Sequence, residues 1–191
     1  MIPHVIFNYS WVYDERMHIW NRKKFTEENE KNGRLYIKKF QKKWDKIEKK
    51  VMNALSKVSG LKFKCHYMNT YIVTCDLRAF SAPLTLSACK SMDSNIRILI
   101  HELIHNLLVQ NKEKVVKKCL AKYSKFSRVT KIHILVHAIQ KETLKKLFGE
   151  KITEKSIKRS SLNPDYKKAW DIVEKEGTKN IIKEKIRLRK A

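Results

Sequence analysis

The chain has 191 residues, enough for one domain with a substantial core, or for one domain with an appendage. Hydrophobic residues make up 42% and aromatic residues 9%, which is typical of a globular protein and excludes a disordered one. No apolar run approaches the ~20 residues that span a bilayer, and the N-terminus lacks the basic and small-residue features of a signal peptide. We therefore expect a cytoplasmic protein with no membrane partner.

The formal net charge is +24. Charge of this sign attracts nucleic acid by neutralising phosphates. However, lysine outnumbers arginine and is spread along the whole chain, whereas proteins that clamp phosphates or read bases rely more on arginine. A nucleic-acid partner is therefore an alternative expectation, and compositional bias is the favoured explanation.

The cysteines are widely spaced and form no C-x-x-C pair. This pattern predicts free thiols in a reducing compartment and neither a disulfide framework nor a zinc knuckle. The four residues are Cys65, Cys75, Cys89 and Cys119.

The N-terminal half predicts strands around one long helix. The β-prone segments Val5–Phe7 and Trp11–Tyr13 indicate one early strand. Apolar residues at steps of three and four predict an amphipathic helix from Leu35 to Val58, ended by Gly60.

Three further strands are expected over 61–67, 71–75 and 82–87, with a turn at 69–70. Pro83 favours a sheet edge for the last of these strands, because a proline there loses no ladder hydrogen bond.

The remainder of the chain is predicted to be mainly helical. Asp93 or Ser94 is expected to cap a helix that begins there. The other expected elements are a helix over 131–148 ended by Gly149, a polar connector over 150–165, and a short amphipathic helix over 166–173.

The most informative segment is His101-Glu-Leu-Ile-His105, which lies inside an apolar run of helical length. Residues four apart share a helical face, so both imidazoles can reach one metal ion. Glu102, beside the first, can take a proton from a metal-bound water. This H-E-x-x-H pattern is typical of zinc peptidases, so Zn²⁺ is the expected cofactor.

A catalytic zinc needs three protein ligands and one open position, so a third ligand must come from elsewhere. His133 and His137 are again four apart on a predicted helix, and we favour His137 because small Ala138 beside it allows close helix approach. His133 and Glu142 are the alternatives. Tyr166 is a candidate donor to the oxyanion, on residue type alone.

The H-E-x-x-H segment resembles that of the zincin clan of metallopeptidases, and the arrangement over about residues 35–148 is similar to the compact soluble archaeal members. The resemblance implies that His101 and His105 bind zinc and that Glu102 is the general base. Leu108 and Asn111 stand where metzincins have glycine and histidine, which excludes that subfamily.

We therefore expect an α+β, zincin-like fold. A small mixed or antiparallel sheet with an edge strand packs on a backing helix and on the H-E-x-x-H helix, followed by a mostly helical C-terminal part. Residues 1–150 form the catalytic domain and 151–191 a helical segment that packs on it or covers it. The edge strand can pair with an extended peptide substrate.

The expected function is zinc-dependent hydrolysis of peptide bonds by a Glu-activated, zinc-bound water. One alternative is a nucleic-acid-associated protein with a structural or vestigial metal site, or a protease that acts on nucleic-acid-bound proteins. A second is a di-metal carboxylate bundle, because Glu102-x-x-His105 also fits that class, although the chain offers no second E-x-x-H. The oligomeric state is open.

Overall fold

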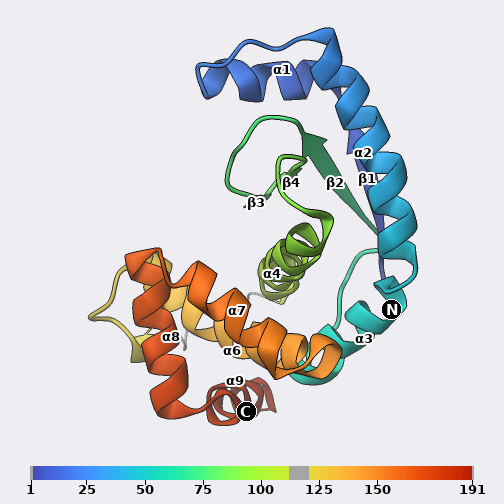
Figure 1. Cartoon of the computed structure of the whole chain (residues 1–191). Helices are drawn as coiled ribbons and strands as arrows, with labels where there is room; N and C mark the ends of the chain where they lie inside the picture. Colours follow the sequence, from blue (N-terminus) through green and yellow to red (C-terminus); the bar gives the residue numbers. More distant parts are fainter. Residues whose placement is uncertain (1, 112–120, 191) are drawn as a thin grey trace. The chain divides into compact units, whose positions relative to one another are not determined.

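A computed structural model describes residues 2–111 and 121–190, without the side chains of 185–190 (Figure 1). The lysine-rich stretch 112–120, with Cys119, lies outside the described residues. The described chain is α+β, mostly helical, with a small mixed sheet. It divides into two compact units, residues 1–49 with 64–103 and residues 50–63 with 104–191. Helix α4 (Met92–Gln110) belongs to both.

The sheet lies in the first unit and has the strand order β1-β2-β4-β3. Strand β2 pairs in parallel with β1 and with β4, and β3 pairs antiparallel with β4. The sheet is therefore mixed, as expected. The strands span His4–Tyr9 (β1), Tyr67–Val73 (β2), Phe80–Ser81 (β3) and Leu84–Ser87 (β4).

The prediction of β structure at Trp11–Tyr13 is wrong. Strand β1 ends at Tyr9, and helix α1 (Trp11–Trp20) follows at once. The Ser10 side chain accepts a hydrogen bond from the Tyr13 backbone N–H, which satisfies one of the unpaired donors of the first turn. This N-cap outweighs the β propensity of the bulky residues that follow it.

The predicted helix 35–58 is two helices that begin earlier, α2 (Glu27–Asp45) and α3 (Glu48–Ser59). Thr26 caps α2, and Gly33, which precedes the predicted start at Leu35, lies inside it. A Cβ at Gly33 would lie 2.2 Å from the Tyr9 ring. Glycine is present there because an aromatic ring occupies the space of a side chain, so its low helix propensity is no sign of a helix end.

Two strand assignments also differ. The turn expected at 69–70 lies inside the continuous strand β2, in which Thr70 is buried, and no strand covers 61–66. Strand β4 is not the sheet edge, because β3 pairs with Leu84 and Thr85. Pro83 falls between β3 and β4, outside the strand whose edge position it was expected to mark.

The second unit contains α6 (Arg128–Phe148), α7 (Glu150–Ser160), α8 (Pro164–Glu176) and α9 (Thr178–Lys190). The helices predicted over 131–148 and 166–173 are confirmed, as is the end of the first at Gly149, and the second extends to the C-cap Gly177. The connector predicted at 150–165 is wrong, because α7 fills most of it and buries Thr153. Helix α6 packs against α7, α8 and α9.

Among the described residues, no helix combines the length and the apolar character required to cross a membrane. Cys65, Cys75 and Cys89 form no disulfide within this part of the chain.

Candidate metal centre

Helix α4 begins at Met92, before the predicted caps. The Ser91 hydroxyl accepts a hydrogen bond from the Ser94 backbone N–H at 3.3 Å, so Ser91 occupies the capping position expected at Asp93 or Ser94. The helix is apolar over most of its circumference, with five side chains fully buried: Leu99, Ile100, Leu103, Ile104 and Leu107. The H-E-x-x-H segment is thus carried by a well-anchored helix.

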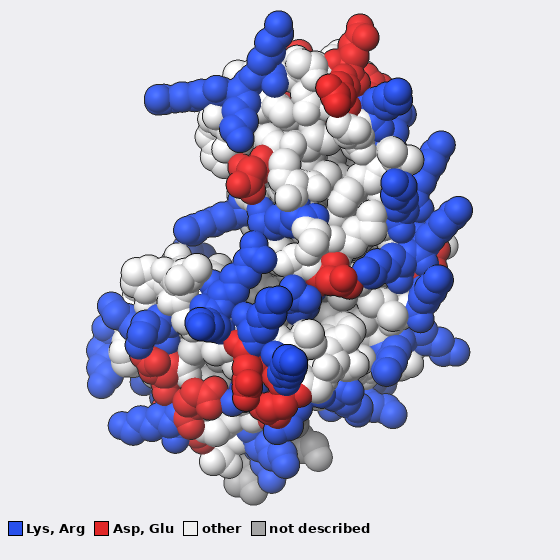
Figure 2. Space-filling view, in the orientation of Figure 1, with Lys and Arg blue, Asp and Glu red and all other residues white. Residues whose placement is uncertain are grey.

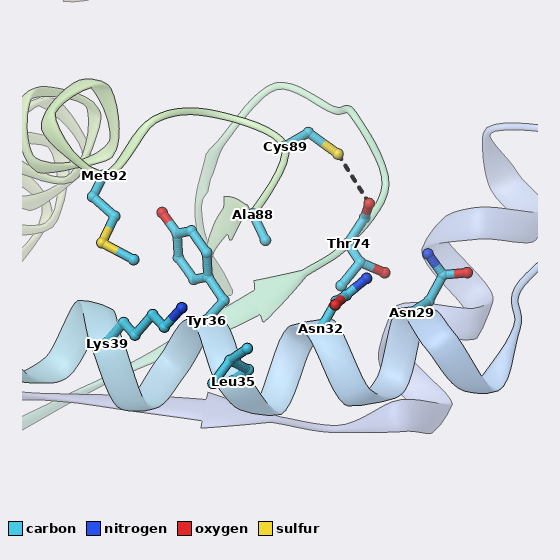
Figure 3. Close-up of a pocket in the computed structure, with 9 residues that line it drawn as sticks. All are labelled: Asn29, Asn32, Leu35, Tyr36, Lys39, Thr74, Ala88, Cys89 and Met92. Carbon is cyan, nitrogen blue, oxygen red and sulfur yellow. Dashed lines mark hydrogen bonds between the residues drawn. The ribbon is translucent and has the colours of Figure 1, made fainter.

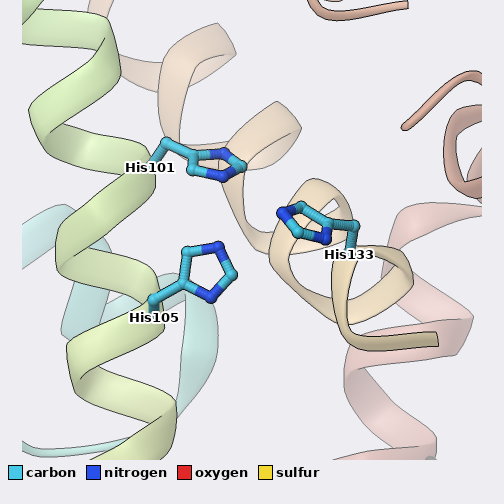
Figure 4. A group of neighbouring side chains, drawn as sticks. All are labelled: His101, His105 and His133. Carbon is cyan, nitrogen blue, oxygen red and sulfur yellow. The ribbon is translucent and has the colours of Figure 1, made fainter. Parts of the chain in front are cut away.

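Three imidazoles gather at this helix (Figure 4). His101 and His105 lie one turn apart on α4, and His133 approaches from α6. Each ring offers one nitrogen, and these three nitrogens all lie within 4.8 Å of one another. The His105 and His133 ring centroids are 4.9 Å apart. Three nitrogen ligands with an open fourth position are the donor set of a catalytic zinc site.

Backbone contacts orient His133. Its Nδ1 lies 2.8 Å from the carbonyl oxygen of Val129, which can only accept a hydrogen bond, so Nδ1 carries the proton. The lone pair of the neutral ring is therefore on Nε2. Burial lowers the pKa of His133, which favours this neutral form. A metal-binding histidine commonly donates its other N–H to a carbonyl in this way.

His137, the third ligand favoured from the sequence, is not in the group of three. It lies one turn after His133 on α6. Its ring stacks on Trp170 with centroids 4.0 Å apart and an angle of 6° between planes. Its centroid is 5.3 Å from that of His133. Glu142, the other alternative, accepts a hydrogen bond from Thr178 at the start of α9. Of the three candidates, the geometry brings His133 to the α4 pair.

Helix α8 supports both histidines of α6. Tyr166 stacks on His133 with centroids 4.1 Å apart, just as Trp170 stacks on His137. Both pairs have i,i+4 spacing, so one face of α8 covers one face of α6. The start of α8 is held by Asp165, whose carboxylate accepts hydrogen bonds from Ser127 and Thr130. The Tyr166 ring is thereby kept beside a proposed ligand.

Glu102 is buried, with 8% of its surface exposed. Burial raises the pKa of its carboxyl to about 7, because a charge is poorly solvated there. A general base works best when its pKa lies near the working pH, so this carboxyl suits proton transfer near neutrality.

Two of the remaining histidines lie outside any candidate metal group: the His4 ring hydrogen-bonds Glu48, and the His66 and Tyr67 ring centroids are 6.5 Å apart. His18 differs. It is buried on α1 beside Asp14 and Cys75, and their ligand atoms also lie within 4.8 Å of one another. The D-x-x-x-H spacing could have revealed this pair, but only once residues 11–20 are recognised as a helix.

The first unit also contains a pocket at the carboxyl ends of the parallel strands β2 and β4 (Figure 3). Thr74 directly follows β2, and Ala88 and Cys89 directly follow β4. The pocket is lined by both polar and apolar side chains, from the following set: Asn29, Asn32, Leu35, Tyr36, Lys39, Thr74, Ala88, Cys89 and Met92.

Comparisons with models of known protein families, with curated proteins and with solved structures found no match to this chain.

Proposed function

We propose that this protein is a zinc-dependent metallopeptidase. The observation that carries the proposal is the convergence of His101, His105 and His133 around one point, with Glu102 next to the first of them. The imidazole nitrogens are the ligands that zinc prefers in catalytic sites, and three of them leave one coordination position open. Zinc in such a site polarises a carbonyl oxygen and lowers the pKa of water.

In this proposal Glu102 is the general base. It removes a proton from the water that attacks the scissile carbonyl carbon, and then delivers that proton to the leaving amine nitrogen. Its raised pKa suits both steps, because the group must accept and release a proton at the same pH. Proton transfer of this kind contributes roughly 10²–10⁴-fold to a rate.

Tyr166 is the proposed oxyanion donor. Its ring stacks on His133, so its hydroxyl is carried by a side chain that already contacts a ligand. A hydroxyl that donates to the developing negative charge stabilises the tetrahedral transition state. Peptide or protein is the expected substrate class, since the pair of water activation and oxyanion stabilisation is the chemistry of acyl transfer to water.

Glu102→Gln tests the proposal directly. Glutamine keeps the size of the side chain and cannot accept the proton, so we expect zinc content to stay at the wild-type level and peptide hydrolysis to fall by about 10²-fold or more. The assay is cleavage of a fluorogenic peptide library and of an unfolded protein. Glu154→Gln, an exposed position on α7, is the matched control and should hydrolyse at the wild-type rate. Equal hydrolysis by Glu102→Gln and Glu154→Gln would contradict the proposal.

A further inference from the structure

A second group of metal-ligating side chains lies in the first unit, far along the sequence from the H-E-x-x-H segment. Asp14 and His18 are four apart on α1, and Cys75 follows the end of β2 by two residues. A carboxylate oxygen, an imidazole nitrogen and the thiol sulfur lie within 4.8 Å of one another. All three residues are at least 96% buried.

Part of the surroundings of this group is apolar. Cys75 belongs to a core cluster with Val73 and Leu77, against which Tyr13 and Met17 pack. A carboxylate is costly in such a place unless hydrogen bonds or a cation compensate it. Among the described residues, the ion pairs of this structure give Asp14 no lysine or arginine partner. Its nearest basic group is the His18 ring, whose Nε2 lies 3.6 Å from Oδ1.

Neutral donors hold the Asp14 carboxylate. Oδ1 accepts from the Thr74 backbone N–H at 2.7 Å. Oδ2 accepts from the Thr74 hydroxyl at 2.8 Å and from the Tyr9 hydroxyl at 3.0 Å. The carboxylate is thus oriented before any cation arrives, as the ligands of tight metal sites are.

Lys24 and Thr74 orient the His18 ring. His18 Nδ1 faces the Lys24 carbonyl oxygen at 3.1 Å, so Nδ1 carries a proton. Nε2 lies 3.0 Å from the Thr74 hydroxyl, which donates to Asp14, so Thr74 bridges the ring and the carboxylate.

Cys75 is a thiol near neutral pH, because burial raises the pKa of Cys75 to about 11. A divalent cation that displaces the thiol proton is surrounded by a carboxylate, a thiolate and an imidazole, so two negative charges face its two positive charges. The sum is zero, which is the total that a buried site tolerates best.

We propose that Asp14, His18 and Cys75 form a second, structural metal site for Zn²⁺ or a similar borderline-soft cation, which fastens α1 to the end of β2. The donor set of one sulfur, one nitrogen and one oxygen is among those zinc accepts. Ligands held tetrahedrally by zinc lie roughly 3.5 Å apart, and Asp14 Oδ1 and His18 Nε2 are already 3.6 Å apart. The thiol proton of Cys75 leaves to solvent when the ion binds.

Thr74 links this group to the neighbouring pocket, which it lines (Figure 3). Its hydroxyl and backbone N–H are the groups that contact His18 and Asp14. The Cys89 thiol, also in the pocket wall, donates to the Thr74 carbonyl at 3.0 Å.

Cobalt titration of the full chain tests this site separately from the three-histidine group. Co²⁺ bound to a thiolate gives an intense sulfur-to-metal charge-transfer band in the near ultraviolet, which three imidazoles cannot produce. We expect this band in the wild type, its loss in Cys75→Ser, and its retention in Cys89→Ser, where the exposed thiol of the same unit is removed. It should also persist in His105→Ala, which disables only the histidine group.

The triple variant Cys65→Ser, Cys89→Ser, Cys119→Ser leaves Cys75 as its only cysteine and keeps all three proposed ligands. It should keep the band with one cobalt per chain, and this arm holds even if Cys75→Ser fails to fold. Absence of the band in this variant would overturn the proposal, and the three side chains would then be held by hydrogen bonds without a metal ion. A band that survives Cys75→Ser and disappears with another cysteine would overturn it as well.

Discussion

At the scale of single residues, burial has opposite effects on the pKa of His133 and on that of Glu102. His133 donates through Nδ1 to the Val129 carbonyl, which fixes the tautomer that presents Nε2. Burial keeps the pKa of His133 low and that of Glu102 high, so the first is neutral and the second can exchange a proton near pH 7. Burial thus favours the neutral imidazole that the proposed ligand His133 needs and the pKa that the proposed base Glu102 needs.

Tyr166→Phe separates the two contributions of that side chain. Phenylalanine keeps the stack on His133 and removes only the hydroxyl, so zinc affinity should stay within about twofold. If the hydroxyl stabilises the oxyanion, kcat should fall by about 10²-fold with little change in KM, because the interaction forms in the transition state. Steady-state hydrolysis of one peptide gives both constants. Unchanged kcat would restrict Tyr166 to supporting His133.

At the scale of elements, the packing of helix α2 predicts whether Gly33→Ala raises or lowers the free energy of unfolding. Alanine normally stabilises a helix relative to glycine by about 1 kcal/mol. At Gly33 the new Cβ would lie 2.2 Å from the Tyr9 ring, and overpacking of this kind costs about 1–3 kcal/mol. We therefore expect Gly33→Ala to lower the free energy of unfolding, as measured by urea denaturation. The exposed Lys38→Ala in the same helix should change it by less than about 0.5 kcal/mol. A stabilised Gly33→Ala would contradict the packing described here.

The elements also show what a sequence pattern can and cannot predict. Helix α6 was predicted closely because its apolar periodicity runs between a serine cap and a glycine stop, both local signals. The start of α2 was not predicted, because Gly33 lies in that helix to make room for the Tyr9 ring, which belongs to another element. Local propensity likewise misplaced α1, where one N-cap bond at Ser10 decides the outcome.

The candidate site also combines a part that local sequence signals predict with a part that depends on tertiary packing. The spacing of His101 and His105 predicts their common face because a single helix carries both. His133 and His137 share a face of α6, so the choice between them depends on which turn of that helix passes α4, and Tyr166 and Trp170 of α8 stack on these two turns. No spacing rule contains this information.

At the scale of the whole molecule, charge is the dominant feature. Lysine and arginine side chains project over much of the face shown in Figure 2, and acidic groups form small clusters among them. The formal charge of +24 predicts salt-dependent association with nucleic acid, because each neutralised phosphate releases a counterion.

We expect the affinity for duplex DNA, measured by fluorescence anisotropy, to fall by about tenfold or more between 50 and 200 mM salt. The affinity should be the same for Glu102→Gln, because that substitution leaves the basic surface unchanged. Affinity that is flat across this salt range would attribute the lysines to composition and remove nucleic acid as a partner.

The central claim is that His133 completes a zinc site with His101 and His105. Zinc per chain, measured by elemental mass spectrometry on protein purified without chelator, tests it most directly in His133→Ala and His137→Ala, with folding checked by circular dichroism. The account predicts that zinc falls by one equivalent relative to wild type in His133→Ala and is unchanged in His137→Ala. Full zinc content in His133→Ala, or its loss in folded His137→Ala alone, would contradict it.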